Sequence, residues 1–303
     1  MAGPFVSVLK YWSAVIKTTV TLWLEAQVFM HAAALAFFTV FSVAPVVIVA
    51  VTLVGLVLGE SAAQGRIAEH LQVVIGPEAA AAVQTAVENS RIQHSGLLPT
   101  IAGFAAILFG ATTVFTQMQD ALNAIWGVAP RPTRSSVFIY LKTRLLSLAV
   151  VLGIGFVLLV SLTLSVLVRG VVTFAEDWLP VPVPVVLGLD WVVSLTVITL
   201  LFATIFRVLP DVVLRWRDVL LGAFVTALLF ALGRALIAIY LSTTATASTY
   251  GAAGSLVLLL WVNYSSLILL FGAAFTRAHL EARGLTVRPR STAICVHRLL
   301  VED

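Results

Sequence analysis

Charged side chains are scarce in this 303-residue chain, where Asp, Glu, Lys and Arg make up 11% of the residues and hydrophobic types make up 60%. So few charges leave little material for a water-soluble module. The only cysteine is Cys295, which excludes a disulfide framework and a thiolate metal cluster. We therefore expect one membrane-embedded domain without a redox role.

Sequence signatures of enzymes are missing as well. The five histidines share no metal-binding spacing, and the chain has no His-Glu-x-x-His motif, glycine-rich phosphate loop or Gly-x-Ser-x-Gly elbow. No catalytic residue, metal or cofactor is predicted. The chain is accordingly not expected to be an enzyme.

What the chain does have is a series of long apolar runs. Each reaches the ~20 residues that an α-helix needs to cross the hydrocarbon core of a bilayer. The runs cover residues 32–58, 97–118, 145–168, 183–206, 219–241 and 252–275. The predicted fold is therefore an all-α polytopic membrane protein with six transmembrane helices.

The cationic residues fall mainly in alternate loops between these runs. Fourteen of the eighteen Lys and Arg lie before the first run, after the sixth, or in the loops after the second and fourth. Because cytoplasmic loops carry the excess of Lys and Arg, both termini are predicted to be cytoplasmic. The net charge of +4 then reflects loops facing anionic lipid, and no nucleic-acid partner is expected.

Three further segments surround or interrupt the predicted transmembrane domain of residues 32–276. Residues 1–31 place apolar side chains at helical spacing beside Lys10 and Lys17, which predicts an amphipathic helix on the cytoplasmic leaflet or against the cytoplasmic helix ends. Residues 60–96 predict two short extracytoplasmic helices. The tail, residues 277–303, is polar and is expected to be partly disordered.

Charged residues inside an apolar run are costly and usually mark a partner, a cavity or a substrate path. Arg234 lies inside the fifth run and Asp190 near the outer end of the fourth. We hypothesise an ion pair between them, or a polar cavity shared with Asn263 and Tyr264 of the sixth run. The alternative is a purely structural pair, or an Arg234 side chain that extends to the outer interface.

Proline and glycine positions suggest where the helices bend or approach closely. Pro45 removes a backbone hydrogen bond from the first run and predicts a kink, which is either a hinge or a static bend satisfied by Ser42. Gly222, Thr226 and Gly272 are small residues of the kind that let membrane helices pack closely.

Polar residues near the predicted cytoplasmic surface form a second set of candidates. They combine acidic, amide and guanidinium groups that could hold a lipid headgroup, and they are Asp120, Asn123, Arg131, Arg134, Arg215 and Arg217. The alternative is that those around Trp126 cap the second helix and anchor it at the interface.

Several motifs taken together resemble the YihY/virulence-factor BrkB family of bacterial inner-membrane proteins. They are Ala32 to Pro45, Ala121 to Gly127, Leu209-Pro-Asp211, Trp216 to Ala223, Tyr250 to Gly254, Leu260 to Tyr264 and Phe271 to Ala273. The resemblance covers roughly residues 10–280. It implies a six-span protein of the bacterial inner membrane. Some members carry the label ribonuclease BN, but this chain has neither a metal-binding cluster nor a soluble basic domain for tRNA.

These observations favour a transporter or lipid-handling protein for an anionic or amphipathic envelope component. Its expected partners are membrane lipids, anionic ones included, and envelope-assembly proteins. The alternative is a structural scaffold that holds such a protein through residues 60–96. A tRNA-processing ribonuclease is the least favoured function.

Overall fold

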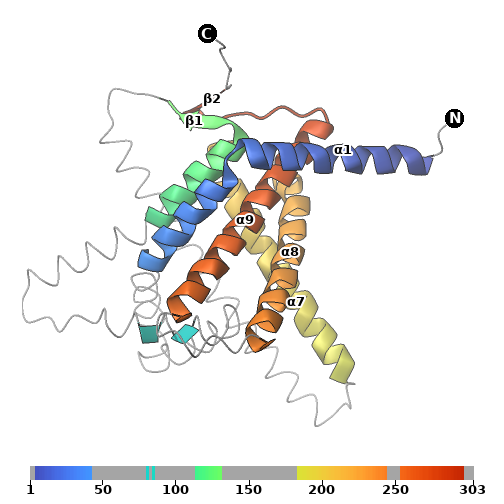
Figure 1. Ribbon diagram of the computed structural model, residues 1–303. Coiled ribbons are helices and arrows are strands. Elements are labelled where there is room, and N and C mark those ends of the chain that lie inside the picture. Colours follow the sequence, from blue (N-terminus) through green and yellow to red (C-terminus); the bar gives the residue numbers. More distant parts are fainter. Residues whose placement is uncertain are drawn as a thin grey trace, which may run out of the picture.

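The computed structural model describes residues 4–42, 80–81, 84–85, 113–131, 183–243 and 253–296. Its named elements are α1 (Pro4–Glu25), β1 (Val128–Pro130), α7 (Val183–Val208), α8 (Trp216–Thr243), α9 (Ala253–Ala282) and β2 (Ala293–Cys295) (Figure 1). Two longer helical stretches lie between α1 and β1, at Val28–Ser42 and at residues 113–126, and residues 80–81 and 84–85 are helical as well.

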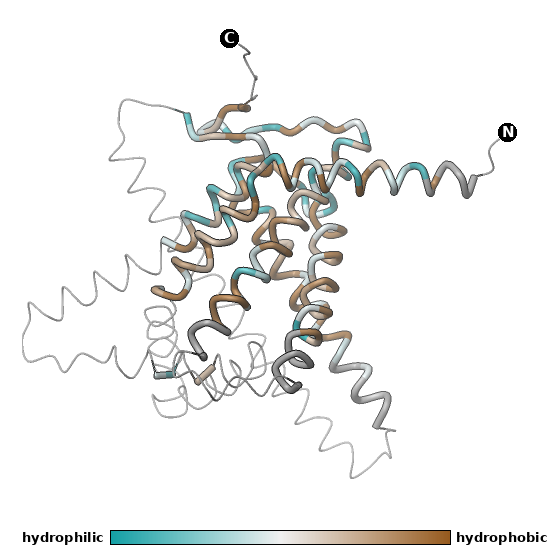
Figure 2. Tube along the Cα trace, in the orientation of Figure 1, coloured by the Kyte–Doolittle hydropathy of each residue, from teal (hydrophilic) through white to brown (hydrophobic). Residues whose placement is uncertain are grey.

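Three of the described helices are long and apolar enough to cross a membrane. Their apolar segments are Trp191–Val208 in α7, Trp216–Leu236 in α8 and Leu258–Ala282 in α9. Figure 2 shows hydrophobic residues along these helices and hydrophilic ones concentrated near the end where β1 and β2 lie. The three correspond to the last three predicted spans.

Helix α9 continues seven residues past the predicted end of the sixth span, Phe275, to Ala282. The polar residues there remain helical because Arg277 and Glu281 form an i,i+4 ion pair, with Nε and Oε1 2.7 Å apart. Ala278 and Leu280 are buried on the same turns. The boundary predicted from hydropathy therefore falls one to two turns before the end of the helix.

Helices α8 and α9 pack closely through small residues, as the sequence predicts. A side chain at Gly222 would overlap Thr276 Oγ1, and one at Gly272 would overlap Thr226 Oγ1. Each hydroxyl donates to a carbonyl of its own helix: Thr226 Oγ1 to the Gly222 carbonyl at 2.6 Å, and Thr276 Oγ1 to the Gly272 carbonyl at 2.7 Å. The two Gly-x-x-x-Thr motifs therefore face each other in antiparallel order across one helix crossing.

Helix α1 lies across one end of the bundle and packs on α9 (Figure 1). Val15 and Thr19 are buried, and Tyr11 Oη lies 3.1 Å from His279 Nδ1. Another face of α1 stays exposed and apolar at successive i+4 positions: Val8, Trp12, Ile16, Val20 and Leu24. A helix with this distribution fits a membrane interface, with one face on protein and another on lipid.

Helix α1 is separated from Val28–Ser42 by a bend of 61°. The bend is made at Gln27, whose φ of 52° lies in the left-handed region that non-glycine residues rarely adopt. Ala26 before it and Val28 after it are both buried. The turn therefore redirects the chain from the end of the bundle into the Val28–Ser42 helix.

The residues after α9 fold back over the same end of the bundle. We call residues 283–296 the C-terminal strap. Its strand β2 pairs antiparallel with β1, and Val212 forms an isolated bridge with Pro289. Arg290 Nη2 donates to the carbonyls of Arg207 and Val208, each 3.1 Å away, at the end of α7. The sequence predicts a partly disordered tail. The part of that tail that the structure describes is instead bonded to β1 and to the end of α7.

Other predictions fall mostly outside the described residues. The span 145–168 and Pro45 lie wholly outside them, the span 97–118 is described only from residue 113, and the loop 60–96 only at four helical residues. Those four lie toward the opposite end of the molecule from β1 (Figure 1). The total of six spans stays a prediction.

Candidate binding pocket at the basic end

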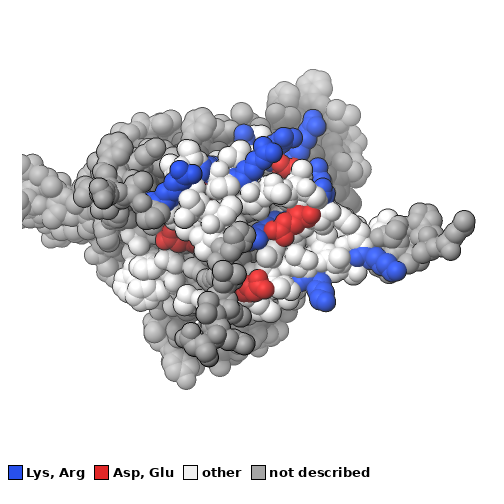
Figure 3. Space-filling view, turned by 90° about the horizontal axis from the view of Figure 1, so that it is seen from above, with Lys and Arg blue, Asp and Glu red and all other residues white. Residues whose placement is uncertain are grey.

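The end of the bundle that carries α1, β1, β2 and the strap is rich in Lys and Arg. Figure 3 views this end from above and shows the basic side chains spread over it, with acidic ones among them. The described basic residues on these elements and on the adjoining ends of α7, α8 and α9 are Lys10, Lys17, Arg131, Arg207, Arg215, Arg217, Arg277, Arg283, Arg288 and Arg290. We call this surface the basic end.

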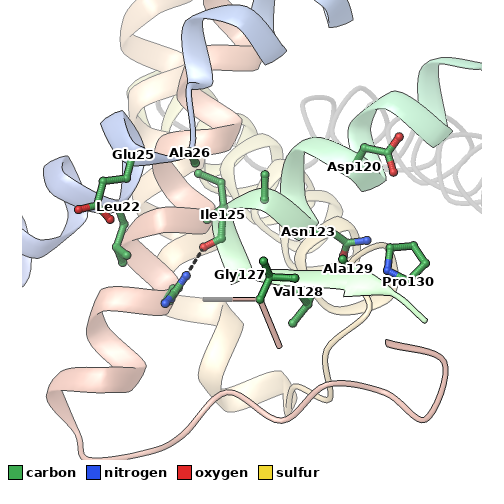
Figure 4. A pocket seen from close by; sticks show the side chains of 13 residues that line it. Leu22, Glu25, Ala26, Asp120, Asn123, Ile125, Gly127, Val128, Ala129 and Pro130 are labelled. Atoms are coloured by element: carbon green, nitrogen blue, oxygen red, sulfur yellow. Dashed lines mark hydrogen bonds between the residues drawn. The ribbon is translucent and has the colours of Figure 1, made fainter. Parts of the chain in front are cut away.

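A pocket of about 660 Å³ opens at the basic end, next to the bend after α1 (Figure 4). We call it the bend pocket. It lies between the end of α1, the last turns of the 113–126 helix, β1, and Arg277 of α9. Its lining residues are Leu22, Glu25, Ala26, Asp120, Asn123, Ala124, Ile125, Gly127, Val128, Ala129, Pro130, Arg277 and Val296. A pocket of this volume is within the range of small-molecule sites.

One wall of the pocket is fixed by a contact between Asn123 and Asp211. Asn123 Nδ2 donates to Asp211 Oδ2 at 2.9 Å, and the Asp211 backbone N–H donates to Asn123 Oδ1 at 2.8 Å. Gln119 Nε2 donates to the same carboxylate oxygen at 3.2 Å. Asn123 is buried. Its amide nitrogen and amide oxygen both find a hydrogen-bond partner in Asp211, as buried polar groups require. This pair ties the 113–126 helix to the link between α7 and α8.

Gly127 and Arg277 determine where the 113–126 helix ends. Gly127 has a φ of 64° and its N–H donates to the Ala124 carbonyl, 3.2 Å away, which is the left-handed geometry of a helix C-terminus. Arg277 Nη1 donates to the carbonyl of Ile125 at 2.7 Å. A Cβ at Gly127 would lie 3.2 Å from that Nη1 atom. A side chain here would crowd the guanidinium, and the positive φ favours glycine at this position.

Two carboxylates contribute to the pocket lining, Glu25 from α1 and Asp120 from the 113–126 helix (Figure 4). Asp120 remains exposed to solvent. Even so, partial desolvation by the surrounding protein, together with the nearby Asp211 carboxylate, raises the pKa of Asp120 above its ordinary value. Asp211 accepts hydrogen bonds from Asn123 and Gln119.

The structure divides the predicted headgroup-binding residues into groups. Asp120 and Asn123 line the bend pocket, while Arg131 directly follows the pocket-lining Pro130 and its Nε lies 3.4 Å from the Ala293 carbonyl. Arg215 and Arg217 are exposed at the start of α8 and do not line the pocket. Arg134 lies outside the described residues.

The predicted intramembrane site is only partly described. Arg234 is exposed on α8, eighteen residues after its start at Trp216, and the side chain of Asp190 lies outside the described part of the chain. Tyr264 packs against α8 at Gly233, where an added Cβ would overlap its ring, and Asn263 is half-buried. The structure thus places Tyr264 beside the residue that precedes Arg234, while the ion pair stays a prediction.

The first-span candidate Ser42 is buried, and its hydroxyl donates to the Phe38 carbonyl at 2.7 Å. This is an i−4 backbone contact of the kind that accompanies helix bending. The kink expected at Pro45 lies outside the described residues.

Three residues of the candidate site were not predicted from the sequence. Glu25 and Arg277 lie in segments predicted only as an amphipathic helix and a partly disordered tail, and Asp211 was noted only within the motif Leu209-Pro-Asp211. The i,i+4 spacing of Arg277 and Glu281 was the available signal that α9 continues. No local pattern could place Asp211 against Asn123, which is 88 residues away in the sequence.

Long apolar helices, apolar side chains exposed along α8 and a basic end define an integral membrane protein. The exposed α8 residues are Leu220, Leu221, Phe224, Leu228, Leu232 and Leu236. The chain matches the virulence factor BrkB family over residues 19–293 and belongs to that family. The segments Ala121 to Gly127 and Leu209-Pro-Asp211, both within the matched range, meet in the Asn123–Asp211 contact.

Three similar proteins, each named UPF0761 membrane protein, come from different bacteria. The one from Pseudomonas paraeruginosa is 30% identical over 80% of this chain and 57% of its own length. The protein from Alcanivorax borkumensis is 26% identical over 82% of this chain and 56% of its own length. The protein from Ralstonia nicotianae is 29% identical over 61% of this chain and 40% of its own length. The chain thus spans about half the length of these relatives. No solved structure matches it.

Proposed function

We propose that this membrane protein handles lipids, as a transporter of an anionic or amphipathic component of the bacterial envelope. The observation that carries the proposal is the bend pocket, which combines charged walls with apolar ones at the basic end. Amphipathic molecules require both kinds of surface in one site. No chemical conversion of the transported molecule is part of the proposal.

The proposed location is the bacterial inner membrane, with the basic end and both termini in the cytoplasm. Two features support this orientation. The described cations collect at one end of the helices, with Arg234 as the exception. Helix α1 also lies across that end and exposes an apolar row, which suits a helix at the lipid interface.

The position of the pocket relative to α1 supports access from the membrane. Leu22, Glu25 and Ala26 of the bend contribute to its lining, and Leu24 and Val20 of the same helix are exposed and apolar. A lipid lying along α1 would therefore have its acyl chains on the apolar row and its headgroup near the pocket. This arrangement follows the usual depth of interfacial helices, at the boundary between headgroups and chains.

The test is a lipid-movement assay in liposomes that contain the full-length protein. Fluorescent lipids with zwitterionic and anionic headgroups would be followed as they exchange between leaflets, using a membrane-impermeant quencher. We expect exchange faster than in protein-free liposomes. Exchange at the protein-free rate for every lipid would overturn the proposal.

A pair of variants tests whether the bend pocket is the route. Ala129→Trp would fill the pocket from β1, whereas Ala282→Trp adds the same side chain at an exposed position outside the pocket. We expect exchange to fall to the protein-free rate in the first variant and to stay at the wild-type rate in the second. Both must have the wild-type elution profile and melting temperature. Equal rates in the two variants would exclude the pocket as the route.

A further inference from the structure

Helix α1 presents distinct faces along its length. One face is buried on α9, where Val15 is 1% exposed and Thr19 is 0% exposed. The apolar row lies beside this face, and its five members are between 36% and 56% exposed. Ala14, Thr21 and Glu25 are also exposed and, at spacings of seven and four residues, share the opposite flank. The helix therefore has an apolar flank and a polar flank on either side of its contact with α9.

Two lysines lie at the border between these flanks. Lys10 and Lys17 are seven residues apart on one face, and Lys17 precedes Val20 and Leu24 of the apolar row by three and seven residues. Both lysines are exposed, and among the described residues neither ammonium group lies within ion-pair distance of a carboxylate. Lysines at the border of an apolar flank are typical of helices that lie in the interface of a bilayer.

Contacts with α9 fix the direction of these flanks. The Trp12 ring stacks on the His279 ring with centroids 5.8 Å apart, and Trp23 Nε1 donates to the Leu267 carbonyl at 3.3 Å. The polar flank carries Glu25, which lines the bend pocket at the basic end. The apolar flank lies on the other side of the helix and therefore faces the membrane-crossing part of the bundle.

An anionic lipid fits this surface better than a second copy of the chain does. A second α1 would bring two further lysines and a single acid, Glu25, on the far flank. A lipid leaflet supplies hydrocarbon for the row and phosphates at its border, and each basic residue at an anionic surface strengthens binding about fivefold. Figure 1 shows the N-terminal half of α1 extending past α8 and α9, where these helices do not cover it.

We propose that α1 binds anionic phospholipid of the leaflet next to the basic end. Its apolar row lies among the acyl chains, and Lys10 and Lys17 pair with headgroup phosphates. The partner is the membrane surface itself, so the proposal goes beyond transport through the bend pocket and does not depend on it. It also gives the depth of that pocket, because the last turn of the same helix lines it. The pocket then opens at the level of the headgroups.

Two spin labels on α1 test its depth in liposomes that contain the full-length protein. In a Cys295→Ser background, Ile16→Cys places a label in the apolar row and Ala14→Cys places one on the polar flank. We expect the first label to collide mainly with oxygen and the second mainly with a water-soluble nickel chelate. Access of nickel to the label at residue 16 would overturn the proposal. Shielding of that label from both reagents would also overturn it, because a second copy of the chain would then cover the row.

The preference for anionic lipid can be measured at the same position. A bimane group on Ile16→Cys would be quenched by brominated phosphatidylglycerol or brominated phosphatidylcholine, each at the same low mole fraction in vesicles of the unbrominated lipids. We expect phosphatidylglycerol to be enriched about fivefold or more around residue 16. Lys10→Gln with Lys17→Gln should abolish this enrichment. Equal quenching by the two brominated lipids in the protein with both lysines would overturn the anionic assignment.

Two variants serve as matched controls. Lys10→Arg with Lys17→Arg keeps both charges and should keep the preference. Arg215→Gln with Arg217→Gln removes two exposed charges at the start of α8, at the same end of the protein, and should leave quenching at residue 16 unchanged. A loss of preference equal to that of the Lys10→Gln and Lys17→Gln protein would contradict the assignment to α1.

The result can be separated from the proposed transport function. If α1 lies in the anionic leaflet but liposomes show no lipid exchange, the transport proposal fails and this one stands. If lipids exchange but the label at residue 16 meets nickel, transport stands and the assignment of α1 fails.

Discussion

Asn123 and Asp211 hold each other through two hydrogen bonds, one in each direction, between the 113–126 helix and the α7–α8 link. Both residues lie within the range that matches the BrkB family. Their contact positions the helix turn that carries Asp120, and the Asp211 backbone carbonyl accepts from the Arg290 N–H of the strap at 2.9 Å. Asp211 thus joins the pocket wall to the C-terminal strap.

Replacing Asn123 by Ala should destabilise the fold. The change removes both hydrogen bonds, so the Asp211 carboxylate loses one donor and the Asp211 backbone N–H loses its acceptor. We expect the free energy of unfolding to fall by about 2–4 kcal/mol. The measurement is the melting temperature of the detergent-solubilised protein by intrinsic fluorescence. Gln119→Ala is the graded control because Gln119 donates one bond, at 3.2 Å. An equal fall in melting temperature in the two variants would show that the two Asn123–Asp211 hydrogen bonds stabilise the fold no more than the single bond from Gln119.

The crossing of α8 and α9 predicts a large difference between two glycine-to-alanine changes. At Gly222 an added Cβ would overlap Thr276 and lie 3.1 Å from the Gly272 carbonyl oxygen, so Gly222→Ala should cost about 1–3 kcal/mol. Gly188 is exposed on α7 with nothing within 4 Å of the added atom, so Gly188→Ala should be neutral or stabilising by up to about 1 kcal/mol. Thermal unfolding of both variants decides the matter. Similar melting temperatures would mean that close helix approach at Gly222 is unimportant.

The single cysteine provides a test of orientation. Cys295 is exposed at the basic end, which is proposed to be cytoplasmic. A membrane-impermeant maleimide should therefore label it in inverted vesicles and leave it unlabelled in right-side-out vesicles. The control is Thr85→Cys in a Cys295→Ser background, because Thr85 is exposed in the loop predicted to be extracytoplasmic and should show the opposite pattern. Labelling of Cys295 from the right-side-out vesicles would reverse the proposed topology.

Local sequence patterns anticipated the helices well and the site only in part. Hydropathy located α7, α8 and α9 to within a few residues at their starts, and the small residues Gly222 and Gly272 indicated the close crossing. Asp120 and Asn123 were identified as polar groups near the surface. Their grouping with Glu25 and Arg277 depends on a bend at Gln27 and on a helix end capped from α9, and neither is encoded by a local periodicity.

The last prediction concerns the pH dependence of stability at Asp120. Because the pKa of this carboxyl is raised in the folded protein, the folded state binds its proton more tightly than the unfolded state. The resulting stabilisation is complete below the unfolded pKa and is lost as the pH rises through the folded one. At neutral pH without ligand, Asp120→Asn should therefore melt higher than the wild type, and the difference should shrink as the pH falls toward 4. Asp218→Asn, at a half-buried acid that pairs with Arg283, controls for the loss of one acidic charge at the same end of the protein. A difference between Asp120→Asn and wild type that is constant with pH would contradict the raised pKa.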